Sequence, residues 1–268
     1  MAARRTITGF SNPTVKFLRS LREKKLRRRE RKFLAEGLRL LTDARDCGIL
    51  PEMLVMASGR EAHPLLLQLE DAVVAAGGEV VEMDQAILAK VTGKDNPQAV
   101  AGVFAEFDTR LSQLDRGAAP IWLVAQALRD PGNLGTMLRT GDAVGAGGLI
   151  LIDDCADPFS VEAVRASMGA IFTQRLAVAR WDEFVAWLRS GPGQLVAASL
   201  RDPTDYRAAS YTAPCFLLVG NESQGLPEAY EAECDLRVTI PMRGRADSLN
   251  AAVAGAVLAY EALAKFEG

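Results

Sequence analysis

Three short stretches of the sequence combine polar side chains with glycine or proline. The first runs from Arg129 to Arg139 (RDPGNLGTMLR), and its Asp-Pro-Gly start is typical of a turn. Asn133 and Arg139 are six residues apart, about 600° of helical rotation, so they do not share one helix face. The amide can orient a neighbouring group and the guanidinium can hold an anion. A capping asparagine and a surface arginine would give the same pattern.

The second stretch runs from Leu218 to Pro227 (LVGNESQGLP) and places one carboxylate, Glu222, in a glycine-rich turn. Glycines allow backbone amides to approach a ligand closely. A carboxylate in this turn can accept hydrogen bonds from a ribose or an adenine. Taken alone, the pattern also fits an ordinary loop between a strand and a helix.

The third stretch runs from Ile240 to Asn250 (IPMRGRADSLN). We expect a strand to end at Pro241, and Ser248 or Asp247 to cap a following helix of small residues. Ser248 and Asn250 can both donate hydrogen bonds at this helix N-terminus, where backbone amides already favour an anion. Simple capping is the alternative interpretation.

The remaining reactive residues exclude several chemistries. His63 is the single histidine, so neither a multi-histidine metal site nor a hydrolase with a separate catalytic histidine fits, and we expect His63 to start a helix. Cys47, Cys155, Cys215 and Cys234 lack the spacing of zinc or redox motifs. We therefore expect no metal site, and reduced, mostly buried thiols in a cytosolic protein.

The charge is distributed unevenly along the chain. Residues 1–45 hold 14 Lys or Arg and 4 acidic residues, whereas the remainder holds 17 basic and 30 acidic residues. A basic N-terminal arm on an acidic body indicates a polyanionic partner. We expect RNA phosphates to contact the cations of the densest run, namely Lys24, Lys25, Arg27, Arg28, Arg29, Arg31 and Lys32. No aromatic residues interleave with this run, so base stacking is not expected, and a solvated helix face is the alternative.

No apolar run reaches the roughly 18 residues that span a bilayer. The first residues are basic but no apolar segment follows them, so we do not expect a secretory signal. These observations predict a cytoplasmic protein without a membrane partner.

The elements that must position these residues fall into two regions, 1–107 and 121–268, joined by a polar linker at 108–120. In the first region, Asn12-Pro13 is a helix start, and Leu34, Leu38 and Leu41 favour a second helix that ends at Gly48. A smaller α/β unit is predicted, with strands near 53–56, 80–83 and 99–107 and helices at 64–76 and from Asp84 to Val91.

In the second region, strands and helices alternate regularly. The strands are expected at 121–125, 149–153, 176–179, 195–200, 216–219 and 236–240, and the helices at about 133–146, 160–169, 181–190, 226–233 and 248–266. This alternation predicts an α/β fold with a parallel sheet covered on both faces, in which ligands bind beyond the carboxyl ends of the strands. Each of the three polar stretches follows such a strand end.

The glycine-rich run from Gly141 to Gly148 follows a helix and precedes a strand. A dinucleotide fingerprint requires the order strand, glycines, helix. We therefore interpret the run as a helix end and a tight turn, which argues against a nucleotide-dependent oxidoreductase.

Taken together and in this order, the three stretches resemble motifs one, two and three of the SpoU (TrmH-like) branch of the SPOUT methyltransferases. The resemblance covers the chain from about Ile121 to its end. The stretches Asn12-Pro-Thr-Val-Lys-Phe-Leu, Phe33-Leu-Ala-Glu-Gly37 and Asn96-Pro-Gln98 resemble the ribosomal-protein-like substrate-binding domain of many members. The resemblance implies a trefoil knot in the C-terminal domain, a dimer, and an S-adenosylmethionine cofactor.

The activity implied by the resemblance is methylation of an RNA ribose 2′-hydroxyl, with ribosomal RNA favoured over transfer RNA. The cofactor would be held at the positions that match the family's binding loops, namely Gly220, Ile240, Met242 and Leu249. A non-catalytic RNA-binding protein on the same fold is the alternative.

By the same resemblance, Arg139 is the family's proposed catalytic residue. An arginine is normally always protonated, so we expect it to position the substrate and to act electrostatically, with base catalysis left open. Asn133 is expected to orient Arg139 or the ribose, and Ser248 to bind a phosphate. Glu222 and Asn250 are expected to shape the cofactor loop.

Overall fold

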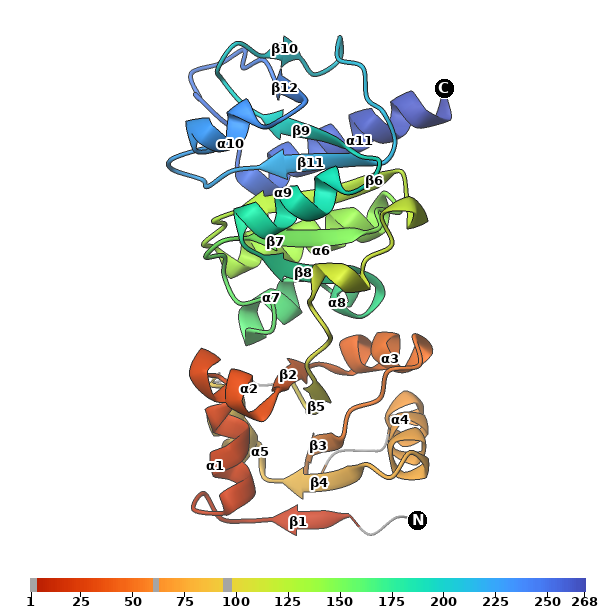
Figure 1. Ribbon diagram of the computed structural model, residues 1–268. Coiled ribbons are helices and arrows are strands. Elements are labelled where there is room, and N and C mark those ends of the chain that lie inside the picture. Colours follow the sequence, from red (N-terminus) through yellow and green to blue (C-terminus); the bar gives the residue numbers. More distant parts are fainter. Residues whose placement is uncertain (1–3, 60–62, 94–97) are drawn as a thin grey trace. The chain divides into compact units, whose positions relative to one another are not determined.

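The computed structural model of the chain describes residues 4–59, 63–93 and 98–268, which form two units (Figure 1). Unit 1 comprises Met1–Glu106 and Asp157–Phe172, and unit 2 comprises Phe107–Ala156 and Thr173–Gly268. The segment 157–172 was predicted to belong to the second region, but its contacts group it with unit 1. Asn96 and Pro97, from one of the stretches used for the resemblance, lie outside the described residues.

Unit 1 is built on a mixed five-stranded sheet in the order β1-β4-β3-β5-β2. β1, β4 and β3 are parallel, whereas β5 and β2 are antiparallel to their neighbours. The elements are β1 (Arg5–Ile7), α1 (Pro13–Ser20), α2 (Lys24–Glu30), β2 (Lys32–Glu36), α3 (Leu38–Asp46), β3 (Met53–Ala57), α4 (Pro64–Ala75), β4 (Glu79–Met83), α5 (Gln85–Thr92) and β5 (Val100–Ala105), followed after the first part of unit 2 by α7 (Val161–Ala166) and α8 (Ala170–Thr173).

Two predicted helix starts in unit 1 are confirmed. Asn12 caps α1, because its side chain accepts a hydrogen bond from the Thr14 amide at 2.9 Å. His63 caps α4 through Nδ1, which accepts from the Leu65 amide at 3.2 Å. The single histidine therefore has a structural role at the start of a helix.

The predicted second helix is present as α3 and ends just before Gly48, but its extension to Leu34 is wrong, because this residue lies in strand β2. β2 pairs antiparallel with β5, and its residues from Phe33 to Glu36 are buried. The Phe33 ring lies 5.6 Å from that of Phe104 and 5.1 Å from that of Phe159. Packing on both faces of the strand thus overrides the helical spacing of the leucines.

Unit 2 is built on a seven-stranded sheet in the order β10-β12-β9-β11-β6-β7-β8. All neighbouring strands are parallel, which confirms the predicted sheet type. The elements are β6 (Ile121–Gln126), α6 (Pro131–Ala143), β7 (Gly148–Ile152), β8 (Arg175–Ala179), α9 (Trp181–Arg189), β9 (Gln194–Ala198), β10 (Thr204–Asp205), β11 (Cys215–Val219), α10 (Glu228–Ala232), β12 (Leu236–Thr239) and α11 (Ala251–Glu267).

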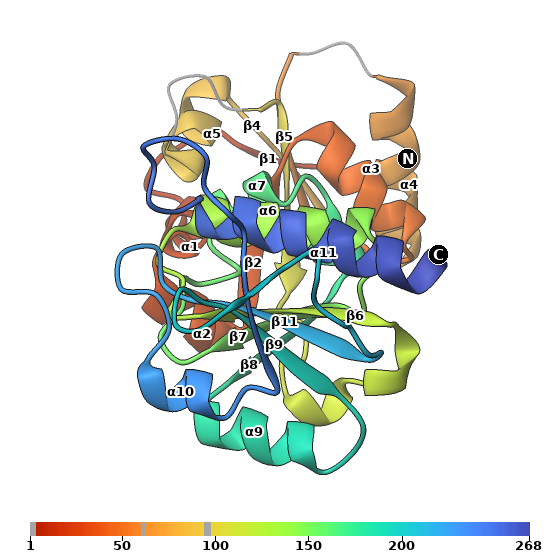
Figure 2. The same ribbon diagram turned by 90° about the horizontal axis from the view of Figure 1, so that it is seen from above.

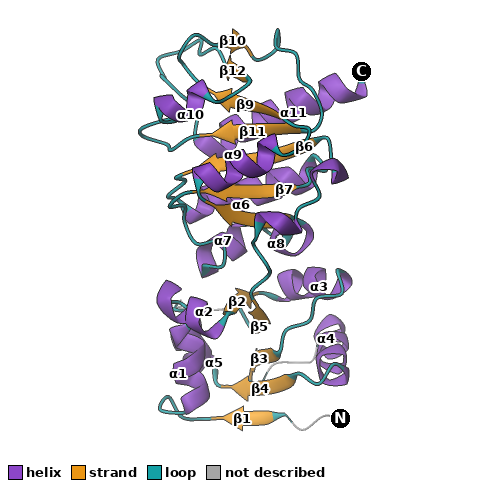
Figure 3. Cartoon of the chain, in the orientation of Figure 1, coloured by secondary structure: helices purple, strands orange, loops and turns teal. Residues whose placement is uncertain are grey.

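Helices cover both faces of the unit 2 sheet. α6 and α11 lie on one face, and α9 and α10 lie on the other (Figure 2; Figure 3 shows the same elements by type). β6, β7 and β11 are buried along their whole lengths, as expected for strands covered on both faces. Within the described residues, no helix has the length and apolar character needed to cross a membrane.

The parallel arrangement brings the three polar stretches to one edge of the sheet. β6, β11 and β12 all end at this edge, and each is followed by one of the stretches. The fold of unit 2 therefore brings together side chains that are up to 117 residues apart in the sequence.

Candidate active site

One side chain from each of the three stretches enters a chain of hydrogen bonds. Nδ2 of Asn133 donates to Oε1 of Glu222 at 3.0 Å, and Nδ2 of Asn250 donates to Oδ1 of Asn133 at 2.9 Å. The Asn133 backbone amide also donates to Asp130, the cap of α6, at 2.8 Å. Because the Asn133 side-chain amide is bonded through both its nitrogen and its oxygen, its orientation is fixed.

Asn250 has a second role as the cap of α11. Its Oδ1 accepts hydrogen bonds from the backbone amides of Ala252 at 3.0 Å and Val253 at 3.3 Å. The prediction that Ser248 or Asp247 caps this helix is wrong, because α11 begins one residue after Asn250. The Asn250 side chain is thus oriented by capping, and its amide nitrogen is directed at Asn133.

The glycine-rich turn of the second stretch is closed by its own backbone. Asn221 and Gly225 exchange backbone hydrogen bonds of 3.2 and 2.9 Å, and Gly225 has a φ of +66°. A Cβ on Gly220 would lie only 2.5 Å from the Gly225 carbonyl carbon, so only glycine fits there. This turn holds the Glu222 backbone in place beside α6.

A cavity of about 370 Å³ lies where the three loops after β9, β11 and β12 meet. Its walls include all four predicted cofactor residues, Gly220, Ile240, Met242 and Leu249, together with Glu222 and Ser248. The volume lies in the range of small-molecule pockets, about 300–1,000 Å³. Apolar side chains and loop backbone, with a few carboxylates and hydroxyls, suit a nucleoside-sized ligand such as S-adenosylmethionine.

Arg139 and Ser248 are not part of the hydrogen-bond chain. Arg139 is exposed on α6 and does not line the cavity. Within the described ranges, no acceptor is bonded to its guanidinium or to the hydroxyl of the exposed Ser248. Both groups are therefore accessible to a substrate.

The basic run of the N-terminal arm divides into buried and exposed cations. Arg27 is 2% exposed, and its Nε and Nη2 donate to Oδ2 of Asp157 at 3.1 and 2.6 Å. Its Nη1 donates to the Leu21 carbonyl at 2.8 Å. The expectation that Arg27 contacts phosphates is therefore corrected, because its guanidinium is used inside unit 1.

The other six cations of the run are more accessible. Three pair with carboxylates: Arg29 with Glu30 at 2.7 Å, Arg31 with Glu106 at 3.5 Å and Lys32 with Glu52 at 2.7 Å. Lys24, Lys25 and Arg28 are exposed on α2, and no carboxylate among the described residues pairs with them. These three remain the strongest candidates for contact with RNA.

Burial raises the pKa of three cysteine thiols, of which Cys155 and Cys215 are buried and Cys234 is half-buried. Desolvation raises the pKa of Cys155 to about 11 and the pKa of Cys215 to about 12. It also raises the pKa of Cys234 to about 12. Cys47 is exposed, so the thiols are mostly but not all buried, as expected. Among the described residues, no group of three or more His, Cys, Asp or Glu side chains is placed to hold a metal ion.

Sequence reasoning missed one wall of the cavity. The loop after β9 contributes Ser199, Leu200 and Arg201, and α10 contributes the buried Glu231. No motif marks these residues, since a lone arginine and a lone glutamate 30 positions apart carry no spacing signal. They meet because β9, which precedes Arg201, lies between β11 and β12, the two strands that α10 connects.

Comparison with known protein families gives two matches. The profile of the SpoU rRNA Methylase family matches residues 120–260, and that of the MRM3-like substrate binding domain matches residues 12–102. A similar protein is the 23S rRNA (guanosine(2553)-2′-O)-methyltransferase RlmP of Bacillus subtilis. It is 31% identical, and the match covers 95% of this chain and 97% of the relative.

Two solved structures resemble the chain over nearly its whole length. An AdoMet-bound rRNA methyltransferase from Sinorhizobium meliloti matches with a TM-score of 0.90 and 40% identity, covering 96% of this chain and 97% of that one. The SpoU methyltransferase AviRb from Streptomyces viridochromogenes, in complex with AdoMet, matches with a TM-score of 0.88 and 28% identity, covering 96% of this chain and 99% of that one.

Proposed function

The chain belongs to the SpoU rRNA methylase family, and on that premise we propose that it methylates a ribose 2′-hydroxyl of ribosomal RNA with S-adenosylmethionine. The observation that carries the proposal is the chain of hydrogen bonds from Glu222 through Asn133 to Asn250. It joins the three polar stretches beside a cavity of the size that a nucleoside-like cofactor needs. The names of relatives such as RlmP support ribosomal RNA as the substrate class.

When bound, the cofactor supplies an electrophilic methyl group on a sulfonium. Gly220, Ile240, Met242 and Leu249 would hold it, because all four line the cavity. The residues of the chain must then bring the hydroxyl in line with that methyl group and stabilise the oxygen as its proton leaves. Glu222, at the cavity wall, links this binding site to Asn133.

Arg139 is assigned the role of an electrostatic and positioning group. Its guanidinium is exposed and not bonded to any described residue, so it can donate two hydrogen bonds to a phosphate or a ribose oxygen. A permanently protonated side chain does not act as a general base under ordinary conditions. Ser248, which lines the cavity with an accessible hydroxyl, is assigned to a phosphate of the RNA.

Unit 1 is assigned to RNA binding. The proposed functional domains are residues 1–107 and 121–268 with the linker 108–120, except that the segment 157–172 groups with unit 1. Lys24, Lys25 and Arg28 supply the exposed cations of α2. Such contacts neutralise phosphates without reading sequence. Recognition of one nucleotide must therefore come from other parts of the chain.

A homodimer is the proposed assembly. On α11, Val253 is 47% exposed and Tyr260 is 54% exposed, and they lie seven residues apart, so both project from one helix face. Leu249, just before the helix, is 36% exposed. An exposed apolar row of this kind favours burial against a second copy of the chain.

The proposal is tested in two steps. Purified protein is expected to bind S-adenosylhomocysteine in calorimetry without added metal, and a chelator is expected to leave the affinity unchanged. Ribosomal RNA from a strain that lacks the gene is then incubated with protein and labelled S-adenosylmethionine, and 2′-O-methyl sites are mapped. A single new site supports the proposal; binding of RNA without any methyl transfer would support the non-catalytic alternative.

A further inference from the structure

An ion pair lies in the wall of the cavity that the sequence did not predict. Nη1 of Arg201 lies 2.7 Å from Oε2 of Glu231, and both residues line the cavity. The Glu231 side chain is only 6% exposed, whereas that of Arg201 is 51% exposed. A carboxylate buried to this extent needs a partner, so the geometry of Arg201 is determined by Glu231.

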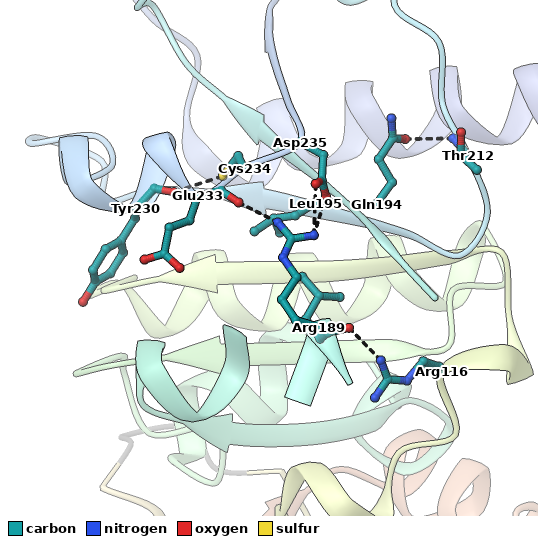
Figure 4. A network of polar contacts seen from close by, with 10 residues as sticks. Arg116, Arg189, Gln194, Leu195, Thr212, Tyr230, Glu233, Cys234 and Asp235 are labelled. Atoms are coloured by element: carbon teal, nitrogen blue, oxygen red, sulfur yellow. Dashed lines mark hydrogen bonds and ion pairs between the residues drawn. The ribbon is translucent and has the colours of Figure 1, made fainter. Parts of the chain in front are cut away.

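The carboxylate belongs to a helix that is held in place on both sides. Next to Glu231, the Tyr230 ring stacks on Trp181 with 4.0 Å between ring centroids and an interplanar angle of 4°. Two residues further on, the Glu233 carbonyl accepts from Arg189 at 2.6 Å, and Arg189 also pairs with Asp235 at 3.0 Å (Figure 4). Helix α10 is thus a rigid support for the Glu231 side chain.

The guanidinium belongs to a short loop that makes few other polar side-chain contacts with the described parts of the chain. This loop, residues 199–203, joins β9 to β10. Ser199 is fixed at its base, because its amide donates to the Val238 carbonyl at 2.9 Å and its Oγ accepts from the Arg201 amide at 2.9 Å. Beyond that base, Leu200 is 76% exposed although it lines the cavity. Among the described residues, the pair with Glu231 is therefore the side-chain contact that ties this loop to α10.

We propose that Arg201 and Glu231 are positioning residues of the cofactor pocket, whose ion pair ties the loop after β9 to α10 and so fixes the position of the wall that they form. The inference rests on the proposed function, since it assumes that the cavity binds S-adenosylmethionine. The pair acts through the loop and not through the reacting atoms. It therefore governs cofactor affinity and leaves the rate of the chemical step unchanged.

The test compares the affinity of variants for two ligands, S-adenosylhomocysteine and 5′-methylthioadenosine, by calorimetry. Arg201→Ala and Glu231→Gln are each expected to weaken the binding of both ligands about tenfold, because the loop loses its link and a buried group loses its partner. Arg201→Lys is expected to recover much of the affinity. The matched control is Arg180→Ala, which removes an exposed ion pair with Asp182 away from the cavity.

Steady-state kinetics supply a second readout. The KM for the cofactor is expected to rise in Arg201→Ala while kcat at saturating cofactor stays within about twofold. The double variant Arg201→Ala/Glu231→Leu leaves no unpaired buried charge, so it is expected to fold and still to bind weakly. If a single variant does not fold, the affinity of this double variant for S-adenosylhomocysteine is measured in its place.

Three outcomes decide against the proposal. Unchanged affinity of a folded Arg201→Ala or double variant overturns it. A loss for S-adenosylhomocysteine alone, with 5′-methylthioadenosine unaffected, overturns it in favour of direct contact with the amino-acid tail. Failure of the unsubstituted protein to bind either ligand contradicts the proposed function itself, and is distinguishable because it appears without any substitution.

Discussion

The guanidinium of Arg139 is exposed, and no acceptor among the described residues is bonded to it. Arg139→Ala is expected to lower turnover at least about a hundredfold, the effect of losing one preorganised electrostatic group. Affinity for S-adenosylhomocysteine should stay within a few-fold, because the residue does not line the cavity. A single-turnover assay and calorimetry measure the two quantities separately.

Arg139→Lys is the matched control for charge. Lysine keeps the positive charge but loses the planar fork that holds an oxyanion at two points, so little rescue is expected. Substantial rescue would indicate that charge alone matters. Normal turnover in both variants would show that Arg139 is an ordinary surface residue and would remove it from the site.

A second residue-scale prediction concerns thiols. Burial raises the pKa of Cys155 from 9.0 to about 11 and that of Cys215 from 9.0 to about 12, so both stay protonated and unreactive at pH 8. In native protein, Ellman's reagent is expected to modify one thiol rapidly, that of the exposed Cys47, and all four in urea. Rapid modification of two or more native thiols would contradict this burial.

The raised pKa values of the buried thiols also determine how the free energy of unfolding changes with pH. The folded pKa of each buried thiol is raised above the unfolded value, so the contribution to stability is complete below about pH 9. It is lost as the pH rises through the folded value, because the unfolded state then releases the proton more readily. Urea midpoints are therefore expected to fall between pH 9 and pH 11.

Residue identities in the site were predictable where a motif marks them. Glu222, Asn133 and Asn250 were selected from three separate stretches, and hydrogen bonds join them in the structure. Arg201 and Glu231 were not predictable, because their meeting depends on which strands are neighbours. A single sequence contains no local signal for such a contact.

At the scale of elements, helix α2 carries exposed cations that can contact RNA as well as one buried arginine that stabilises unit 1. Replacing Lys24, Lys25 and Arg28 together with alanine is expected to weaken RNA binding and to reduce the salt slope by about two to three, since each phosphate contact contributes about 0.7–0.9. Stability should change little, because these side chains are exposed. Filter binding at several salt concentrations measures the slope.

Arg27→Ala is the contrasting variant. It removes the partner of a nearly buried Asp157, whose side chain is 10% exposed, so a loss of about 3 kcal/mol in unfolding free energy is expected. The salt slope of the folded variant should be unchanged. If Arg27→Ala flattened the slope without loss of stability, the assignment of Arg27 as a structural residue would be wrong.

Element type was predicted best where strands and helices alternate. The parallel sheet of unit 2 follows from that alternation, and its predicted strands lie within two residues of β6, β7, β8, β9, β11 and β12. The leucine spacing misled at β2, because pairing with β5 and contact with three phenylalanines outweigh local preference. Such packing partners are distant in sequence and leave no periodicity to read.

At the scale of the whole molecule, the segment 157–172 shows the limit of reading domains along a chain. It lies between β7 and β8 in sequence, yet Val161 belongs to the core cluster of unit 1. A linear division into 1–107 and 121–268 cannot represent such an exchange. The trefoil knot likewise follows from the resemblance and not from any pattern of residues, and it stays a prediction.

The proposed dimer gives the last prediction, which asks whether one active site draws on two chains. Arg139→Ala and Ser248→Ala are each expected to inactivate the protein when made alone. If Arg139 of one chain serves the site that contains Ser248 of the other, a mixed dimer keeps one intact site. Random mixing makes half of the dimers mixed, so about a quarter of the original activity should return, as two-fold symmetry requires.

Co-expression of the two variants with different affinity tags allows the mixed dimers to be purified, and these should reach about half of the original activity. The control combines either variant with Tyr260→Asp, which places a charge in the exposed row of α11 and is expected to prevent pairing. Recovery that persists with Tyr260→Asp would contradict the α11 interface. Complete absence of recovery in purified mixed dimers would show that each site is built within one chain, since every site would then carry one substitution.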